Sequence, residues 1–262
     1  MLMVEGKTSS CVGNSFYDMN IISPEVIYSD DSYIAINKPS GLLVHRSKID
    51  RHETRFALQI VRDYVGHRVF PLHRLDKPTS GVLLFALSQD IARLMMPVFS
   101  DKKVSKRYVA IVRGYCNEHE LIDYPLKEQL DKIADAHADQ DRLAQNAVTE
   151  YKRLDTVELP YSVGRYQTCR YSLLELLPQT GRKHQLRRHM KHIFHPIVGD
   201  TTHGDGKHNQ LFRDELNCHR LMLHARELSF VCPKTQAPIL IRAPFDDDWK
   251  KNFKRFNWSV PA

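Results

Sequence analysis

Short stretches of alternating or unbroken hydrophobic residues run through the chain and predict β-strands joined by turns. Segments 26–28 and 33–37 flank the polar pair Asp30 and Asp31 and predict a hairpin, closed by a turn at 39–41. The apolar run 82–87 is too short to span a membrane and is typical of a buried strand. Further strands are predicted at 106–114, 148–154, 171–177, 220–230 and 239–242. In the first of these, Tyr108 and Ala110 are expected on one face.

Helical spacing of apolar residues occurs in fewer places. A first helix is predicted from Phe56, Ala57, Ile60, Val61 and Tyr64. A second is predicted to begin after Ser88 as N-cap, with Asp90 in its first turn and an inner face of Ile91, Leu94 and Met95. A third follows the turn at 178–181 and runs to about residue 192, and a short C-terminal helix begins at the acidic residues 246–248.

Many strands with few intervening helices predict an α+β fold with a mainly antiparallel sheet. Residues 1–23 have little periodicity and are predicted to be a disordered leader. The folded domain is therefore predicted to span residues 24–262. With 262 residues, 42% of them hydrophobic, the chain can bury a sizeable core.

Charge is unevenly distributed along the chain. The 38 Lys and Arg exceed the 31 Asp and Glu, for a net charge of +7 and a pI near 9.1. Segment 181–195 holds five Lys or Arg and four His without an acid, which is typical of a surface that binds a phosphate backbone. A solvated helix face is the alternative, but such faces usually mix both signs. Segment 117–141, with eight acids and two bases, is predicted to be a solvated excursion.

The five cysteines are scattered and odd in number, and no pair has the spacing of a zinc knuckle or redox motif. The sequence has neither an apolar run of membrane-spanning length nor the pattern of a signal peptide. These features predict a soluble protein of the reducing cytoplasm.

The strongest candidate for chemistry is segment 73–81, which runs into the buried strand at 82–87. Asp76 lies there between Arg74 and Lys77, and nearby positive charge favours the ionised form of a carboxyl group. An ionised carboxylate can attack carbon. The alternative is a surface turn in which Asp76 caps the backbone or pairs with Arg74.

Together with Asp76, four further segments occur in a fixed order at 106–110, 180–187, 195–200 and 220–225. In this combination the sequence resembles the RNA pseudouridine synthases of the large-subunit ribosomal type, over most of residues 26–245. Segments 44–47, 123–126, 130–135 and 182–189 are similar to the branch of that family that modifies uridine 65 in the T stem of tRNA.

The resemblance implies a pseudouridine synthase fold, with a central RNA-binding catalytic cleft flanked by helices and loops. It implies that Asp76 is the nucleophile, attacking either the base or the ribose C1′. Arg187 is expected to pair with Asp76, with Arg182 as a rival, and Tyr108 to stack on the uracil and take part in proton transfer. An ordinary half-buried strand tyrosine is the alternative for Tyr108. Neither a metal nor a cofactor is expected.

The implied partner is tRNA, bound by a monomer. A paired uridine must be flipped out to reach Asp76, and Arg74 is expected to fill the gap unless it forms a structural ion pair. The other expected RNA contacts, mainly to phosphates, are Arg182, Lys183, Arg188 and Lys191.

Four alternatives to this function remain open. A zinc site at His184, His189, His192 and His195 lacks a carboxylate or cysteine within the stretch to complete it. A hydrolytic nuclease would need paired acids, and the dense acidic cluster at 246–248 lies at a predicted helix start. A catalytically silent RNA-binding protein, or the same chemistry on ribosomal RNA or at another tRNA position, would share most of these residues.

Overall fold

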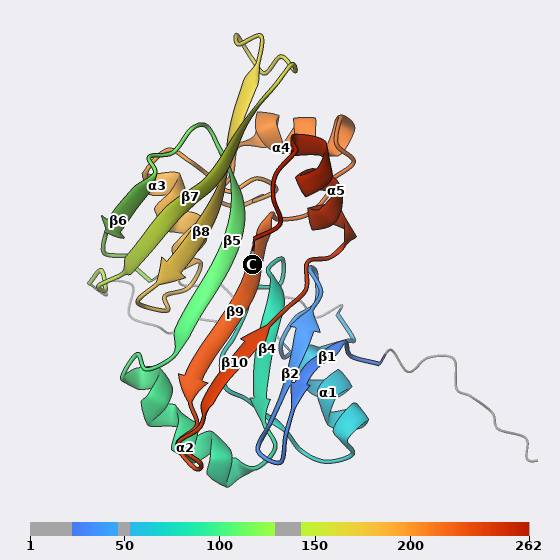
Figure 1. Cartoon of the computed structure of the whole chain (residues 1–262), viewed down its shortest axis with the longest axis vertical. Helices are drawn as coiled ribbons and strands as arrows, with labels where there is room; N and C mark the ends of the chain where they lie inside the picture. The colour runs from blue at the N-terminus through green and yellow to red at the C-terminus, as the bar shows by residue number, and fades with distance from the viewer. Residues whose placement is uncertain (1–22, 47–52, 129–142, 262) are drawn as a thin grey trace, which may run out of the picture.

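The computed structural model describes residues 23–46, 53–128 and 143–261; the predicted leader lies outside this range except for its last residue. In the described part, ten strands form one sheet in the order β1-β2-β4-β9-β5-β8-β7-β6, with β10 paired to β9 and β3 to β4 (Figure 1). Their bounds are β1 Val26–Ser29, β2 Tyr33–Lys38, β3 Phe70–Pro71, β4 Ser80–Ala86, β5 Ser105–Arg113, β6 His119–Asp123, β7 Val148–Leu159, β8 Cys169–Pro178, β9 Leu223–Val231 and β10 Pro238–Arg242. Of the paired strands, β4 and β9 run parallel and the others antiparallel.

Five helices pack around this sheet: α1 Ala57–Val65, α2 Gln89–Ser100, α3 Gln185–His192, α4 Gly206–Asp214 and α5 Asp247–Phe256. Figure 1 shows α3 beside β7 and β8, α2 at the lower end of the sheet, and α4 with α5 at the upper end. The Ser88 hydroxyl accepts a hydrogen bond from the backbone N–H of Ile91, as expected of an N-cap, and Asp246 caps α5 in the same way. None of the described helices is long and apolar enough to cross a membrane.

The central strands bury both of their faces. In β4, Val82 and Leu84 pack with α2 and β10, whereas Leu83 and Phe85 pack with α1 on the opposite face. This explains the unbroken apolar run, because a half-exposed strand would alternate with polar residues. Gly81 begins the run with φ +111°, and a Cβ there would lie 2.2 Å from the carbonyl oxygen of Ala225. The close approach of β9 therefore requires glycine at this position.

The α+β class and the mainly antiparallel sheet are confirmed, as are the hairpin β1–β2 and four predicted helices. Three expectations need correction. Leu94 is exposed, since Ile91, Met95 and Val98 form the buried face of α2. The strand predicted from residue 220 begins at Leu223. The acidic segment 117–141 contains β6, which pairs with β7, while its residues 129–141 lie outside the described range.

Candidate active site

Asp76 lies in the loop that joins β3 to β4. Its carbonyl oxygen accepts a hydrogen bond from the backbone N–H of Thr79 at 3.0 Å. The loop is tied to the turn after β2, where Ser40 Oγ donates to the Pro78 carbonyl at 2.7 Å and the Gly41 N–H to that of Lys77 at 2.9 Å. The nucleophile candidate thus sits on a loop that runs into the buried strand β4 and is tied to the turn after β2, which limits its motion.

The side chain of Lys38 bridges the turn after β2 and the loop that carries Asp76. This side chain is fully buried, and Nζ donates to the carbonyl oxygens of Pro39 at 2.9 Å, Leu42 at 2.8 Å and Lys77 at 3.1 Å. Burial lowers the pKa of Lys38 to about 7, with the charge of Arg220 adding to the effect and that of Asp76 opposing it. The sequence analysis did not assign Lys38 to the site. Its position between the predicted strand 33–37 and Pro39 was only a weak indication of a structural role.

Arg187 contacts Asp76 across the fold. Its Nη1 lies 3.2 Å from Asp76 Oδ2, while Nε and Nη2 donate to the two carboxylate oxygens of Asp200 at 2.7 and 2.8 Å. Burial opposes the Arg187 charge, but the hydrogen bonds to Asp200 outweigh it and raise the pKa of Arg187. Asp200 also accepts from the backbone N–H groups of Thr202 and His203, each at 2.9 Å. The cation is therefore fixed before any substrate arrives.

The structure chooses Arg187 over Arg182 as the partner of Asp76. Arg182 Nε instead donates to the carbonyl oxygen of Asn146 at 3.1 Å. The structure also places the two cations that flank Asp76 in the sequence. Lys77 pairs with Glu53 at 3.0 Å, and Arg74 is exposed at the edge of the cavity. The ion pair of Asp76 thus comes from a residue 111 positions away, which local charge spacing could not reveal.

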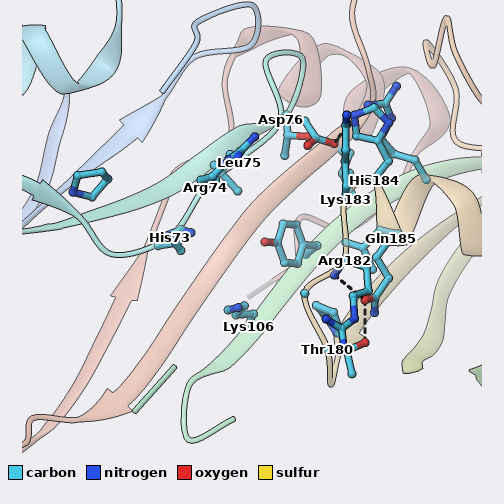
Figure 2. Close-up of a pocket in the computed structure, with 18 of the residues that line it drawn as sticks. His73, Arg74, Leu75, Asp76, Lys106, Thr180, Arg182, Lys183, His184 and Gln185 are labelled. Atoms are coloured by element: carbon cyan, nitrogen blue, oxygen red, sulfur yellow. Dashed lines mark hydrogen bonds and ion pairs between the residues drawn. The ribbon is translucent and has the colours of Figure 1, made fainter. Parts of the chain in front are cut away.

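A cavity of about 680 Å³ opens beside Asp76. Figure 2 shows Asp76 near Lys183 and His184 at one end, with Lys106, Thr180 and Arg182 at the other. Tyr108 lines it from β5 and shares a face with Ala110, as expected. Burial, followed by the negative charge of Asp76, raises the pKa of Tyr108 and keeps its hydroxyl protonated.

His184 is the second group facing Asp76. It precedes α3 in the left-handed conformation, φ 55°, which is uncommon for a residue other than glycine. Its Nε2 lies 3.9 Å from Asp76 Oδ2, and its Nδ1 is 3.0 Å from Nε2 of His203. Burial lowers the pKa of His184, against the opposing influence of Asp76. The basic motif marked this histidine, but its role beside the carboxylate needed the fold.

The expected RNA contacts separate into two groups. Arg74, Arg182 and Lys183 line the cavity. Arg188 and Lys191 lie farther along α3, outside the residues that line it. Four residues that the sequence analysis did not place at the site belong to it or support it: Lys38, Lys106, His184 and Asp200.

Comparison with known proteins agrees with this geometry. Residues 32–192, more than half of the chain, match the family model described as RNA pseudouridylate synthase. The chain belongs to the RNA pseudouridylate synthase family. A protein of Vibrio parahaemolyticus named tRNA pseudouridine synthase C is 58% identical over 234 residues, covering 89% of this chain and 95% of that protein. Proteins of the same name from Haemophilus influenzae and Yersinia pestis are 55% and 50% identical, over 89% and 90% of this chain and 98% and 91% of theirs.

Solved structures give the same family. Human RNA pseudouridylate synthase domain containing 4 superposes with a TM-score of 0.68 at 25% identity, over 90% of this chain and 94% of that one. Human RNA pseudouridylate synthase domain containing 1 has a TM-score of 0.64 at 21% identity, over 92% and 98%, and shows the fold alone. The expected pseudouridine synthase fold and isomerase class are thereby confirmed.

Proposed function

We propose that this protein converts a uridine of tRNA to pseudouridine, with Asp76 as the nucleophile. The observation that carries the proposal is the position of Asp76, facing Arg187 at 3.2 Å in a cavity that Tyr108 also lines. The names of the relatives from Vibrio, Haemophilus and Yersinia support tRNA as the substrate class.

The chemistry needs one positioned nucleophile and proton transfer. The bond between uracil N1 and ribose C1′ breaks, the base turns, and a bond forms between C5 and C1′. C5 loses a proton and N1 gains one, so the reaction is an isomerisation without oxidation. Asp76 attacks the base or C1′, and the bond it forms breaks again as the product is completed, which returns the free carboxylate. Arg187 stabilises and orients that carboxylate, and Tyr108 stacks on the uracil with its hydroxyl available for proton transfer.

Access to Asp76 requires base flipping when the uridine is paired. Extrusion costs a few kcal/mol, and part of this cost is recovered when another group fills the vacated stack. Arg74 is long, exposed and two residues from Asp76 at the edge of the cavity, and we assign it this role. Arg182 and Lys183 at the cavity, with Arg188 and Lys191 beyond it, would contact phosphates.

We further propose uridine 65 in the T stem as the target, because segments such as 123–126 are similar to the branch of the family with that specificity. Residues 24–262 would act as one catalytic domain, as a cytoplasmic monomer, with neither metal nor cofactor. The reaction is therefore expected to proceed at an undiminished rate in EDTA.

The test uses a tRNA transcript labelled with tritium at uridine C5. The wild-type protein should release tritium, whereas Asp76→Asn should release none above background and still bind the transcript. Carbodiimide mapping of the product should place pseudouridine at position 65. Release by Asp76→Asn at the wild-type rate would refute the nucleophile, and a product at another position, or only in ribosomal RNA, would refute the target.

A further inference from the structure

An aromatic pair lies at the end of α3 that is remote from the cavity. The rings of Tyr124 and His192 stack with their centroids 3.6 Å apart and an angle of 15° between their planes. Both residues are exposed, with 42% of Tyr124 accessible. Tyr124 follows β6 and belongs to segment 123–126, which lies outside the motifs that build the catalytic centre.

Helix α3 fixes this pair in place. The ring of His189 is buried, with Nε2 3.1 Å from the carbonyl oxygen of Tyr124 and Nδ1 3.0 Å from Thr149 Oγ1. Arg188 lies near Tyr124. Because its backbone and its ring are both held, Tyr124 presents a flat surface with little conformational freedom left to lose on binding.

The pair lies within reach of an RNA whose flipped base occupies the cavity. His184 lines the cavity and His192 ends the helix, so eight residues at 1.5 Å rise separate them by about 12 Å. Basic residues lie at both ends of the helix, Arg182 and Lys183 near the cavity and Arg188 and Lys191 near the aromatic pair.

We propose that Tyr124, supported by His192, stacks on an unpaired nucleobase of the RNA substrate that lies about 12 Å from the flipped uridine in space. Arg188 and Lys191 bind the neighbouring phosphates. A nucleobase suits this surface because every base offers a π-face, and an exposed aromatic ring beside cations is the usual platform for single-stranded RNA. The inference rests on the proposed function in taking RNA as the substrate, and it adds a second contact that selects RNA with an unpaired segment.

The decisive measurement is the equilibrium dissociation constant for a tRNA transcript, compared between Tyr124→Leu and Tyr124→Trp. Leucine keeps an apolar contact with His192 but cannot stack on a base, so binding should weaken about 5- to 150-fold, the equivalent of about 1–3 kcal/mol per stacked base. Tryptophan should stay near the wild-type value. Tyr64→Leu is the matched control, because Tyr64 is an exposed tyrosine on α1, away from α3 in Figure 1, and should bind as the wild type does.

Salt dependence separates stacking from charge. Arg188→Gln should reduce the slope of log affinity against log salt by about 0.7–0.9, because one phosphate contact is lost, whereas Tyr124→Leu should leave the slope unchanged. A fully paired RNA duplex should bind the wild type and Tyr124→Leu equally. Thermal melting of each variant reports whether the fold is retained.

The proposal is overturned if Tyr124→Leu binds the transcript as tightly as the wild type, since the stack then only anchors the loop after β6. It is also overturned if tryptophan is as weak as leucine, or if the loss is equal on the duplex. Each substitution is measured in the Asp76→Asn protein, which should bind the transcript without turnover, so these outcomes are independent of catalysis. A wild-type protein that binds but releases no tritium refutes the proposed function alone.

Discussion

Arg187 binds Asp76 through Nη1, while the other two nitrogens of its guanidinium each donate a hydrogen bond to Asp200. The contact with Asp76 is 3.2 Å and those with Asp200 are 2.7 and 2.8 Å. The side chain of Arg187 is only 5% exposed, whereas that of Asp76 is 28% exposed and reaches the cavity. Asp200 therefore sets the position of the cation, and the cation sets the position of Asp76, the proposed nucleophile.

Arg187→Lys should reduce the rate of tritium release by about 100-fold or more. Lysine keeps the charge but lacks the planar fork, so it cannot serve both carboxylates, and displacement of a reacting group by about 1 Å can cost this much. Single-turnover release at saturating tRNA measures the effect, and the dissociation constant should change little. A rate within threefold of the wild type would show that the fork is dispensable.

Asp200→Asn tests the same chain of contacts, from Asp200 through Arg187 to Asp76, without altering Arg187 or Asp76, which line the cavity. The variant leaves the Arg187 charge buried with a neutral partner, and breaking a buried pair in this way costs about 3–5 kcal/mol. We expect a lower urea midpoint and slower release together. Loss of stability with an unchanged rate would confine Asp200 to a structural role.

The sequence predicts those residues of the site that belong to one local segment better than those brought together from distant segments of the chain. Asp76 and Tyr108 are marked by motifs that fold locally on a strand or the loop before it, and the structure places both at the cavity. The choice between Arg182 and Arg187 needed the start and direction of α3, because Arg187 lies in its first turn whereas Arg182 precedes the helix and contacts Asn146. Lys38 and Asp200 act through contacts with residues far along the chain, which no local pattern records.

Lys38→Met should destabilise the protein and slow catalysis. The carbonyl oxygens of Pro39, which is exposed, and Leu42, which is half-buried, would lose the Nζ donor at about 0.5–1.5 kcal/mol each, while that of Lys77 would keep its bond from Gly41. Because Lys77 follows Asp76, a looser turn should also reduce tritium release. Urea denaturation and single-turnover assays measure the two effects, and Ser40→Ala, which removes one bond between the same turns, should show a smaller effect of the same sign.

Lys38 should also leave a signature in the pH dependence of stability. Its pKa is about 7 in the folded protein and near 10.5 in the unfolded chain, so between these values the unfolded state binds more protons and stability rises with pH. The urea midpoint of the wild type, relative to that of Lys38→Met, should therefore increase from pH 7 to pH 9. A constant difference would indicate that the buried ammonium stays charged.

Tyr108→Phe should separate stacking from proton transfer. The phenyl ring keeps the face that would contact uracil, so tRNA affinity should stay within about threefold of the wild type, while loss of the hydroxyl should slow release by about 10²–10⁴-fold, the range for general acid–base groups. Tyr108→Leu should weaken binding as well. Equal release by the phenylalanine variant and the wild type would remove the hydroxyl from the mechanism.

Acid should destabilise the fold between pH 6.5 and 4 through histidines that are buried in the neutral form. Burial is the main cause that lowers the pKa of His73 to about 3 and those of His203 and His224 to about 4. In the unfolded chain these groups titrate near 6.5, so below that pH the unfolded state binds more protons and the folded state loses stability until about pH 4. The urea midpoint should fall from pH 7 to pH 5. In His224→Gln, which replaces a ring held by Ser80 and the Ala243 carbonyl, the urea midpoint should fall less steeply with decreasing pH. Identical slopes for the variant and the wild type would exclude His224 as a source of the acid sensitivity.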